Sequence, residues 1–321
     1  MNAPVCVIIA AYNASATIGC AVRSALAQSE VGEVIVVDDG SNDNTGRAAT
    51  ASAGSDPRLV VLRQPRNGGP SAARNHALAA TSMPYVAILD ADDYILPGRF
   101  THLLSISGWD MIADNIVFVP ENDAGDHPAG PEEAEVRALT LEDFVAGNLT
   151  DGNERRGEMG FLKPLMRRAF LEENKLRYDT IMRLGEDYDL YVRALLKGAR
   201  FQLSHRVGYA ARVRAGSLSG VHSTDDLSAL LAATEGHRIA AAQNPRDQAA
   251  IEMHQRQIRD RYVLRAFLDR KAAAGLGGAL RFALSPPANM VPIAAGVMRD
   301  KMAALRGAPR GASPVGRVLL N

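Results

Sequence analysis

Three carboxylates stand within four consecutive positions, 90–93, in the sequence LDADD. The apolar run before them, 85–89, has the composition of a buried strand, so the acids mark the point where the chain leaves a core. Carboxylates this close repel one another unless a cation neutralises them. Because Mg²⁺ and Mn²⁺ prefer oxygen ligands of this kind, the spacing predicts a divalent-metal site, with a purely structural acidic turn as the alternative.

Polar residues also follow the other apolar runs in the first part of the chain. They are Ala11-Tyr12-Asn13, Asp38-Asp39-Gly40-Ser41 and Asn67-Gly68-Gly69. In an open parallel sheet the ligand site lies beyond the carboxyl ends of the strands, so these residues are expected to meet the acid cluster at one edge. Each also has a simpler interpretation as a turn, a helix cap or an aromatic side chain that covers the sheet.

Elements that alternate along the chain would position these residues. Short runs rich in Val and Ile predict buried strands at 5–10, 33–38, 58–62 and 85–90, and helix-like segments separate them at 15–28, 42–53 and 70–82. This rhythm predicts a doubly wound α/β domain with a mostly parallel sheet. We place it at 1–222, with its later part built from helices such as 166–173 and 187–197 and strands such as 109–119 and 207–213.

A different region follows from about residue 223. Ala-rich amphipathic segments predict helices at 225–242, 246–271, 276–284 and 289–305, so we expect an appended α-helical C-terminal region over 223–321. This part is basic. From 254 to 321 the chain has twelve Lys or Arg and three acids, although 36 Lys and Arg balance 36 Asp and Glu over its whole length.

Composition excludes some classes of protein. A net charge of zero argues against a general nucleic-acid binder. The cysteines, Cys6 and Cys20, lie in apolar segments and do not predict a disulfide framework, which favours a reduced, cytoplasmic setting. The N-terminal apolar run is interpreted as a core strand, and uninterrupted apolar windows are shorter than the roughly 18 residues that a spanning helix needs.

The first strand carries neither of the common phosphate-binding signatures. No lysine-containing P-loop follows it, and no GxGxxG opens the first helix, which disfavours phosphotransferases of the P-loop type and nicotinamide dehydrogenases. A diphosphate that is held through Mg²⁺ or Mn²⁺ suits the acids better. Nucleotide-sugars are ligands of this kind.

Five stretches together resemble a known family: PVCVIIAAYN, VVDDGS, NGGPSAARN, LDADD and GEDYDL, in this order. Over about residues 4–220 they resemble the family 2 inverting glycosyltransferases of the GT-A fold, in particular bacterial exopolysaccharide and succinoglycan-type glucosyltransferases. The resemblance implies a nucleotide-binding half at 1–97 and an acceptor half at 98–222. It also implies metal-dependent transfer of a hexose, from UDP-glucose, to a saccharide acceptor that is linked to a lipid, in bacterial exopolysaccharide biosynthesis.

The resemblance assigns the donor site residue by residue. Tyr12 would flank the uracil ring, Asp39 would bind the edge of the ring, and Ala10 would lie beside them where the family usually has proline. Arg74 would face the nucleotide or its phosphates. Asp38 is a supporting candidate, because one acid of such a pair often serves the loop instead.

The metal and the base are assigned in the same way. Asp92 would lie near the ribose and Asp93 on the Mn²⁺ or Mg²⁺ ion, with Asp90 in support. Asp187 would be the base that takes the proton of the acceptor hydroxyl, and Glu186 would orient it or bind acceptor. An acidic first turn that a helix dipole favours is the simpler interpretation of both.

A last group of supporting candidates follows the final strand-like run, where the family contacts the diphosphate: Arg212, Arg214, Ser217 and His222. The basic helices at 276–284 and 289–305 suit an anionic membrane surface at the inner face of the cell membrane. A helical homodimer, or a cap that packs on the core, is the alternative.

Two other functions stay open from the residues alone. A nucleotidyltransferase would share this kind of sheet and metal, but its Gly- and Lys/Arg-rich loop is missing from 11–15. A non-catalytic module that binds nucleotide-sugars is the other, and the acids at 90–93 and 187 weigh against it.

Overall fold

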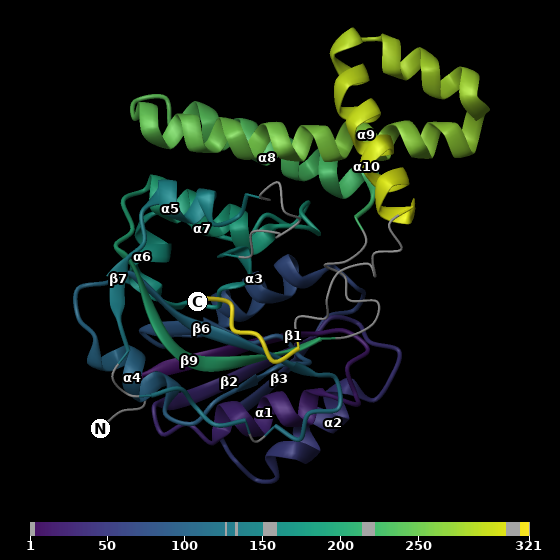
Figure 1. Ribbon diagram of the computed structural model, residues 1–321. Coiled ribbons are helices and arrows are strands. Elements are labelled where there is room, and N and C mark those ends of the chain that lie inside the picture. The colour runs from purple at the N-terminus through teal and green to yellow at the C-terminus, as the bar shows by residue number, and fades with distance from the viewer. Residues whose placement is uncertain are drawn as a thin grey trace. The chain divides into compact units, whose positions relative to one another are not determined.

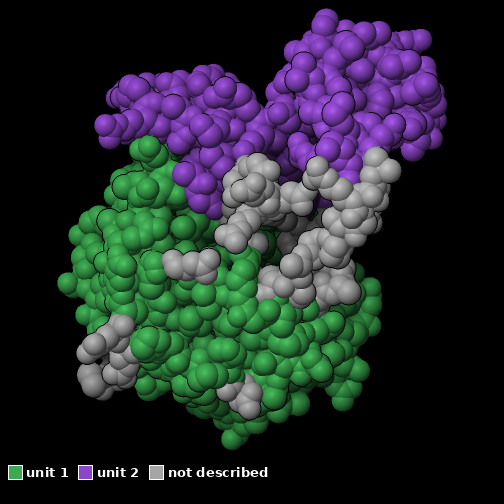
Figure 2. Space-filling model, viewed as in Figure 1, with its two compact units in different colours: residues 1–144, 158–215, 314–321 green, residues 145–157, 216–313 purple. Residues whose placement is uncertain are grey.

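The computed structural model describes residues 4–125, 127–131, 134–149, 159–213, 222–305 and 315–320. The chain divides into two compact units, which Figure 2 colours green and purple. Unit 1 comprises residues 1–144, 158–215 and 314–321, and unit 2 comprises 145–157 and 216–313.

A nine-stranded mixed sheet forms the centre of unit 1, in the order β3-β2-β1-β4-β8-β6-β9-β5, with β7 paired to β9. The strands are β1 Val5–Ala11, β2 Val31–Asp38, β3 Leu59–Arg63, β4 Tyr85–Ile88, β5 Tyr94–Ile95, β6 Met111–Pro120, β7 Val136–Ala138, β8 Leu165–Arg167 and β9 Phe201–Val213. The pairs β3–β2, β2–β1 and β1–β4 are parallel, whereas β8 is antiparallel to both β4 and β6.

The helices before residue 200 are α1 Ile18–Leu26, α2 Thr45–Ala53, α3 Pro70–Ala80, α4 Arg99–Ser105, α5 Leu141–Ala146, α6 Arg168–Glu173 and α7 Glu186–Leu196, with a 3₁₀ turn at Met159–Phe161. Helices α1 and α2 cover one face of the sheet, and α3 lies on the other (Figure 1). The predicted fold class, a mixed and mostly parallel sheet flanked by helices, is thereby confirmed.

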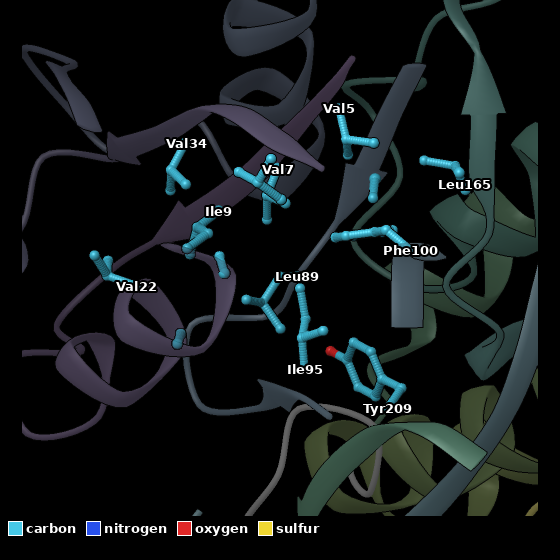
Figure 3. Packing of buried hydrophobic residues seen from close by; sticks show 14 of the residues in the cluster. Val5, Val7, Ile9, Val22, Val34, Leu89, Ile95, Phe100, Leu165 and Tyr209 are labelled. Carbon is cyan, nitrogen blue, oxygen red and sulfur yellow. The ribbon is translucent and has the colours of Figure 1, made fainter. Parts of the chain in front are cut away.

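The core explains why the strands read as continuous apolar runs. Val5, Val7 and Ile9 of β1 point to one face of the sheet and Cys6 and Ile8 to the other, and all five are fully buried because helices cover both faces. Figure 3 shows Val5, Val7 and Ile9 in one cluster with Leu89, which ends the run before the acids, and with Tyr209 of β9, whose hydroxyl points toward the end of that run.

The shortest elements differ from the sequence expectation. Residues 166–173 were expected to form one helix, but β8 covers Leu165–Arg167 and α6 begins only at Arg168. Three residues are too few for a strand period to show in the sequence. The partners of β8 come from distant segments, β4 and β6, so tertiary pairing decides its conformation.

The described C-terminal segment 315–320 also differs, because we expected the whole of 223–321 to be helical. Val318 forms an antiparallel bridge with Val117 of β6. Next to it, Leu319 N donates to the Ile116 carbonyl at 2.8 Å, and Leu320 N donates to Asn115 Oδ1 at 2.8 Å. The segment therefore adds strand-like pairing to β6, within unit 1.

Unit 2 contains α8 Thr224–Ala240, α9 Pro245–Leu284, a 3₁₀ turn Pro287–Asn289 and α10 Met290–Leu305. Helix α9 contains a break, since Gly275 has a φ of 67°, and this break falls between the two helices expected at 246–271 and 276–284. Among the described helices, none combines the length and the apolar character that crossing a membrane requires.

Candidate active site

The acid loop, residues 90–93, is held by the last long strand. Tyr209 of β9 donates its hydroxyl hydrogen to Asp93 Oδ2 at 2.7 Å, and the Tyr209 hydroxyl oxygen accepts a hydrogen bond from Asp90 N at 3.2 Å. Arg212 N donates to Asp93 Oδ1 at 2.8 Å. Burial, followed by repulsion from Asp90 and Asp92, raises the pKa of Asp93 well above its usual range. Asp93 therefore favours its neutral form unless a cation offsets the neighbouring acids.

Two buried cations link this loop to the start of α7. The Nη2 atom of Arg74, on α3, lies 3.0 Å from Asp90 Oδ1. Its Nη1 atom lies 3.2 Å from Asp187 Oδ1 and 3.0 Å from Glu186 Oε1. Lys163, just before β8, places Nζ 2.9 Å from Asp90 Oδ2 and 2.8 Å from Asp187 Oδ2. Asp90 and Asp187 therefore share the same two cations.

Electrostatics stabilises this arrangement of charges. Burial alone would raise the pKa of Asp90, but the charges of Lys163 and Arg74 outweigh it and lower this pKa to about 2. Burial would likewise lower the pKa of Lys163, and the carboxylates of Asp187 and Asp90 raise it instead. Asp90 and Lys163 therefore favour their ionised forms, and removal of one cation would leave buried charge uncompensated.

The local sequence explains how Asp187 reaches the network. Gly185 precedes α7 with a φ of 73°, a left-handed conformation that glycine adopts without strain, and α7 then begins with Glu186 and Asp187. Acids in a first turn are stabilised by the helix dipole. The Asp187 side chain is about 10% exposed, and each of its oxygens faces a cation. It is thus a carboxylate with a restricted orientation.

The acids at the carboxyl end of β2, Asp38 and Asp39, make a different kind of contact. Asp39 accepts hydrogen bonds from Gly68 N and Gly69 N, both at 2.8 Å, and so fixes the loop that precedes α3. Asp38 accepts from Ser41 N at 2.9 Å. Both acids therefore hold backbone turns, and the assignment of Asp39 to a base edge stays a prediction. Tyr12 is 46% exposed, and its assignment to the uracil ring also stays a prediction.

The remaining candidates divide between the units. Ala10 of β1 is half-buried and pairs with Val37 of β2. Arg212 donates through Nη1 to the Asp92 carbonyl at 2.8 Å, so it supports the acid loop from β9. His222 belongs to unit 2. Arg214 and Ser217 lie outside the described residues.

Sequence reasoning missed two residues of the site, Lys163 and Tyr209. Lys163 stands in the stretch FLKPLM, 161–166, where a single lysine interrupts apolar residues. A lysine that is buried in such a stretch needs a carboxylate partner, and this signal could have found it. Tyr209 lies in a strand-like run, and nothing in the sequence distinguishes its hydroxyl from that of any other core tyrosine.

The acid loop can be tested for its fit to a divalent cation. Within the described ranges, no three His, Cys, Asp or Glu side chains form a group that could hold a metal by themselves. Mg²⁺, however, is commonly held by one or two carboxylates together with substrate phosphates. Each oxygen of Asp93 accepts a hydrogen bond, from the Tyr209 hydroxyl or from Arg212 N, and keeps acceptor capacity. The repulsion between neighbouring acids also favours a cation. The loop fits an ion that is shared with a phosphorylated ligand.

These features define an α/β protein in which a carboxylate-rich loop after one strand and a buried carboxylate at a helix start share two cations. The sequence model described as "Glycosyl transferase family 2" matches residues 6–173, more than half of the chain. The chain therefore belongs to glycosyltransferase family 2 and is a glycosyltransferase.

Curated relatives extend the match beyond that segment. "Succinoglycan biosynthesis protein ExoU" of Rhizobium meliloti (strain 1021) is 49% identical over 299 residues, which cover 92% of this chain and 87% of that protein. "Succinoglycan biosynthesis protein ExoO" of the same strain is 35% identical over 304 residues, which cover 91% of this chain and 85% of that protein. The likeness thus includes most of the C-terminal region.

Among solved structures, the S. aureus TarS fragment 1–349 in complex with UDP-GlcNAc matches with a TM-score of 0.60 and 22% identity, over 83% of this chain and 73% of that one. The same fragment in complex with UDP matches with a TM-score of 0.58 and 20% identity, over 99% and 96% of the two chains. At this identity the likeness shows the fold alone, and it agrees with the GT-A type.

Proposed function

We propose that this glycosyltransferase transfers a hexose from a UDP-sugar, UDP-glucose, to a saccharide acceptor that is linked to a lipid, with inversion, during bacterial exopolysaccharide biosynthesis. The observation that carries the proposal is the network in which Asp187 and the acid loop share Arg74 and Lys163. A base and a donor-binding loop need such a fixed relation for one displacement step. The names of the relatives support the succinoglycan type of polysaccharide.

The chemistry follows from one displacement at the anomeric carbon. The oxygen of the acceptor hydroxyl forms the new bond to this carbon while the bond to the phosphate oxygen breaks, and UDP leaves with that electron pair. The hydroxyl proton passes to the carboxylate of Asp187. Attack from the face opposite UDP inverts the configuration, and the step needs no covalent intermediate with the protein.

The other residues would act on the donor. Tyr12 stacks on the base, and Arg74 meets the phosphates as a forked donor. Asp92 would lie near the ribose. Asp93 would hold a divalent ion, which would compensate the charge that develops on the diphosphate. Because Arg74 already binds Asp90 and Asp187, its contact with a ligand would redistribute these ion pairs.

Calorimetry tests the donor half of the proposal. We expect UDP to bind in the presence of Mn²⁺ and the binding to weaken strongly with EDTA. A screen of UDP- and GDP-sugars should then show the fastest release of nucleoside diphosphate from UDP-glucose. UDP binding that is absent or independent of metal contradicts the donor assignment.

The Asp187→Asn variant tests the base. We expect it to keep its affinity for UDP and Mn²⁺ and to lose transfer by about 1,000-fold or more, because the amide accepts no proton. Asp260→Asn, at an exposed position on α9, is the matched control and should behave as wild type. Unchanged transfer in Asp187→Asn would remove Asp187 from the mechanism.

The acceptor half of the proposal places α9 and α10 on an anionic membrane surface. Leu276, Leu280 and Leu284 recur every four residues, so they share one face of α9, and they are 58%, 48% and 57% exposed. Val291 and Met298 of α10 are also exposed, at 75% and 62%. Exposed apolar side chains on basic helices are typical of peripheral membrane contact, and a lipid-linked acceptor would be met there.

Flotation with phosphatidylglycerol liposomes tests this contact. Serine at 276, 280 and 284 together should release the protein from the vesicles, whereas Ile239→Ser, which removes an exposed apolar side chain from α8, should not. Equal flotation of the two variants contradicts the membrane proposal. Sedimentation that shows a dimer, lost only in the triple variant, would assign this face to a homodimer instead.

A further inference from the structure

Lys163 is a buried cation that none of the family motifs contains. Its side chain is about 6% exposed, and its ammonium group lies between Asp90 Oδ2 and Asp187 Oδ2 at 2.9 and 2.8 Å. Arg74 contacts the opposite oxygens of the same two acids, at 3.0 and 3.2 Å. The carboxylate of Asp187 is therefore held at both oxygens, and Lys163 holds one of them.

The backbone around Lys163 is anchored to two further elements. Arg99 of α4 donates through Nη2 to the Lys163 carbonyl at 2.5 Å, and its guanidinium pairs with Asp114 of β6 at 2.8 Å, with both side chains fully or almost fully buried. The preceding carbonyl, of Leu162, accepts from the Tyr191 hydroxyl of α7 at 3.0 Å. These contacts fix the backbone at Lys163, so its side chain has little freedom to follow Asp187 if the Asp187 side chain moves.

This geometry separates Lys163 from the groups that are expected to bind the donor. Arg74 is expected to meet phosphates, so its ion pairs would change when a ligand binds. The position of Lys163 is instead set by the protein on both sides, through α4 and β6 and through α7. It is therefore suited to keep Asp187 at a constant distance from the acid loop.

Resting on the proposed function, we propose that Lys163 is a positioning residue for the base: its ammonium group, shared between Asp90 and Asp187, sets the orientation of the Asp187 carboxylate relative to the donor loop. A displacement reaction tolerates little misplacement, and an error of about 1 Å is enough to lower a rate by about 100-fold. Lys163 contacts neither the donor nor the acceptor in this proposal and acts through Asp187.

Lys163→Met tests the proposal, because methionine keeps most of the side-chain length and removes the charge. With UDP-glucose and Mn²⁺, we expect kcat for UDP release to fall about 100-fold, while KM and the calorimetric affinity for UDP stay within about threefold. Lys163→Arg should recover a substantial part of kcat, since it restores a cation. Lys197→Met, at an exposed lysine after α7, is the matched control and should equal wild type.

A double variant separates positioning from a general loss of structure. If Lys163 acts through Asp187, Lys163→Met should cost nothing further when it is added to Asp187→Asn. A Lys163→Met protein with wild-type kcat, or with UDP affinity that falls in parallel with kcat, overturns the proposal, as does an additive double variant. Wild-type protein that neither binds UDP nor releases it from UDP-glucose overturns the proposed function itself, and the role of Lys163 falls with it.

Discussion

The two ends of the candidate site are built from the same residue type in different ways. At the β2 end, Asp38 and Asp39 use their oxygens to hold backbone N–H groups of nearby turns. At the α7 end, Asp187 faces Arg74, which is 113 positions away in the sequence, and Lys163. At one end, which we call the scaffold end, the acids hold a loop in place. At the other, the base end, buried acids and buried cations neutralise one another. The two should therefore respond differently to substitution.

The largest effect on stability and transfer is expected from Arg74→Met, which removes one of the two buried cations at the base end. This change leaves Asp90, Glu186 and Asp187 with one cation fewer, and breaking a buried ion pair in this way costs about 3–5 kcal/mol. We expect a clear fall in the midpoint of urea unfolding and a loss of transfer. Arg47→Met, at an exposed arginine on α2, is the control; equal stability of the two variants would mean that the network is not a buried charge balance.

A smaller effect is expected at the scaffold end, from Asp39→Asn. The amide keeps one acceptor oxygen, so one of the two hydrogen bonds from Gly68 N and Gly69 N is lost, at a cost of about 1–3 kcal/mol. UDP affinity should also fall, because the loop is less well ordered. Calorimetry measures the affinity and urea unfolding measures the stability, with Asp260→Asn as the control. A loss of stability as large as that of Arg74→Met would contradict the difference between the two ends.

The acid loop should show a trade between stability and ligand binding. The raised pKa of Asp93 means that the folded state disfavours its ionised form, so its contribution to stability is favourable at low pH and is lost as the pH rises through the folded pKa. Asp93→Asn removes the cost of ionising this side chain in the folded state. We therefore expect the melting temperature of the metal-free variant to be a few degrees higher than that of wild type at neutral pH.

The same Asp93→Asn variant should lose the dependence of UDP binding on Mn²⁺, which calorimetry would detect. At acidic pH the difference in melting temperature should shrink, because wild-type Asp93 is then neutral as well. A variant that is less stable than wild type at neutral pH would show that the hydrogen bonds to Asp93 outweigh its repulsion from Asp90 and Asp92.

The smallest effect concerns Cys6, in the core of the sheet near the start of β1. Burial raises the pKa of the Cys6 thiol to about 12, so almost none of it is thiolate at pH 8. Its side chain is also fully buried, which keeps reagents away from the sulfur. Half-buried Cys20 is the internal comparison. We expect one thiol to react with a disulfide reagent in the native protein and two after denaturation. Rapid labelling of both thiols in the folded state would contradict a closed core.

Much of the scaffold end could be predicted, because its signals are local. The runs at 5–10 and 33–38 indicated buried strands, and the turn residues after them indicated where the chain leaves the core. The base end could not be assembled in this way. Lys163 has no neighbouring acid in the sequence, and β8, the strand that follows it, has too few residues to show a period.

The amino-acid sequence alone determined the alternating α/β class, the order of the motifs and the identity of the acids, since period, turn chemistry and composition act over a few residues. The tertiary structure decided which charges meet. Asp90 and Asp187 come together because α3, the segment before β8, and α7 bring Arg74 and Lys163 between them. Coulomb attraction of this strength exists only after the chain has excluded water from the site, and no local pattern can encode that exclusion.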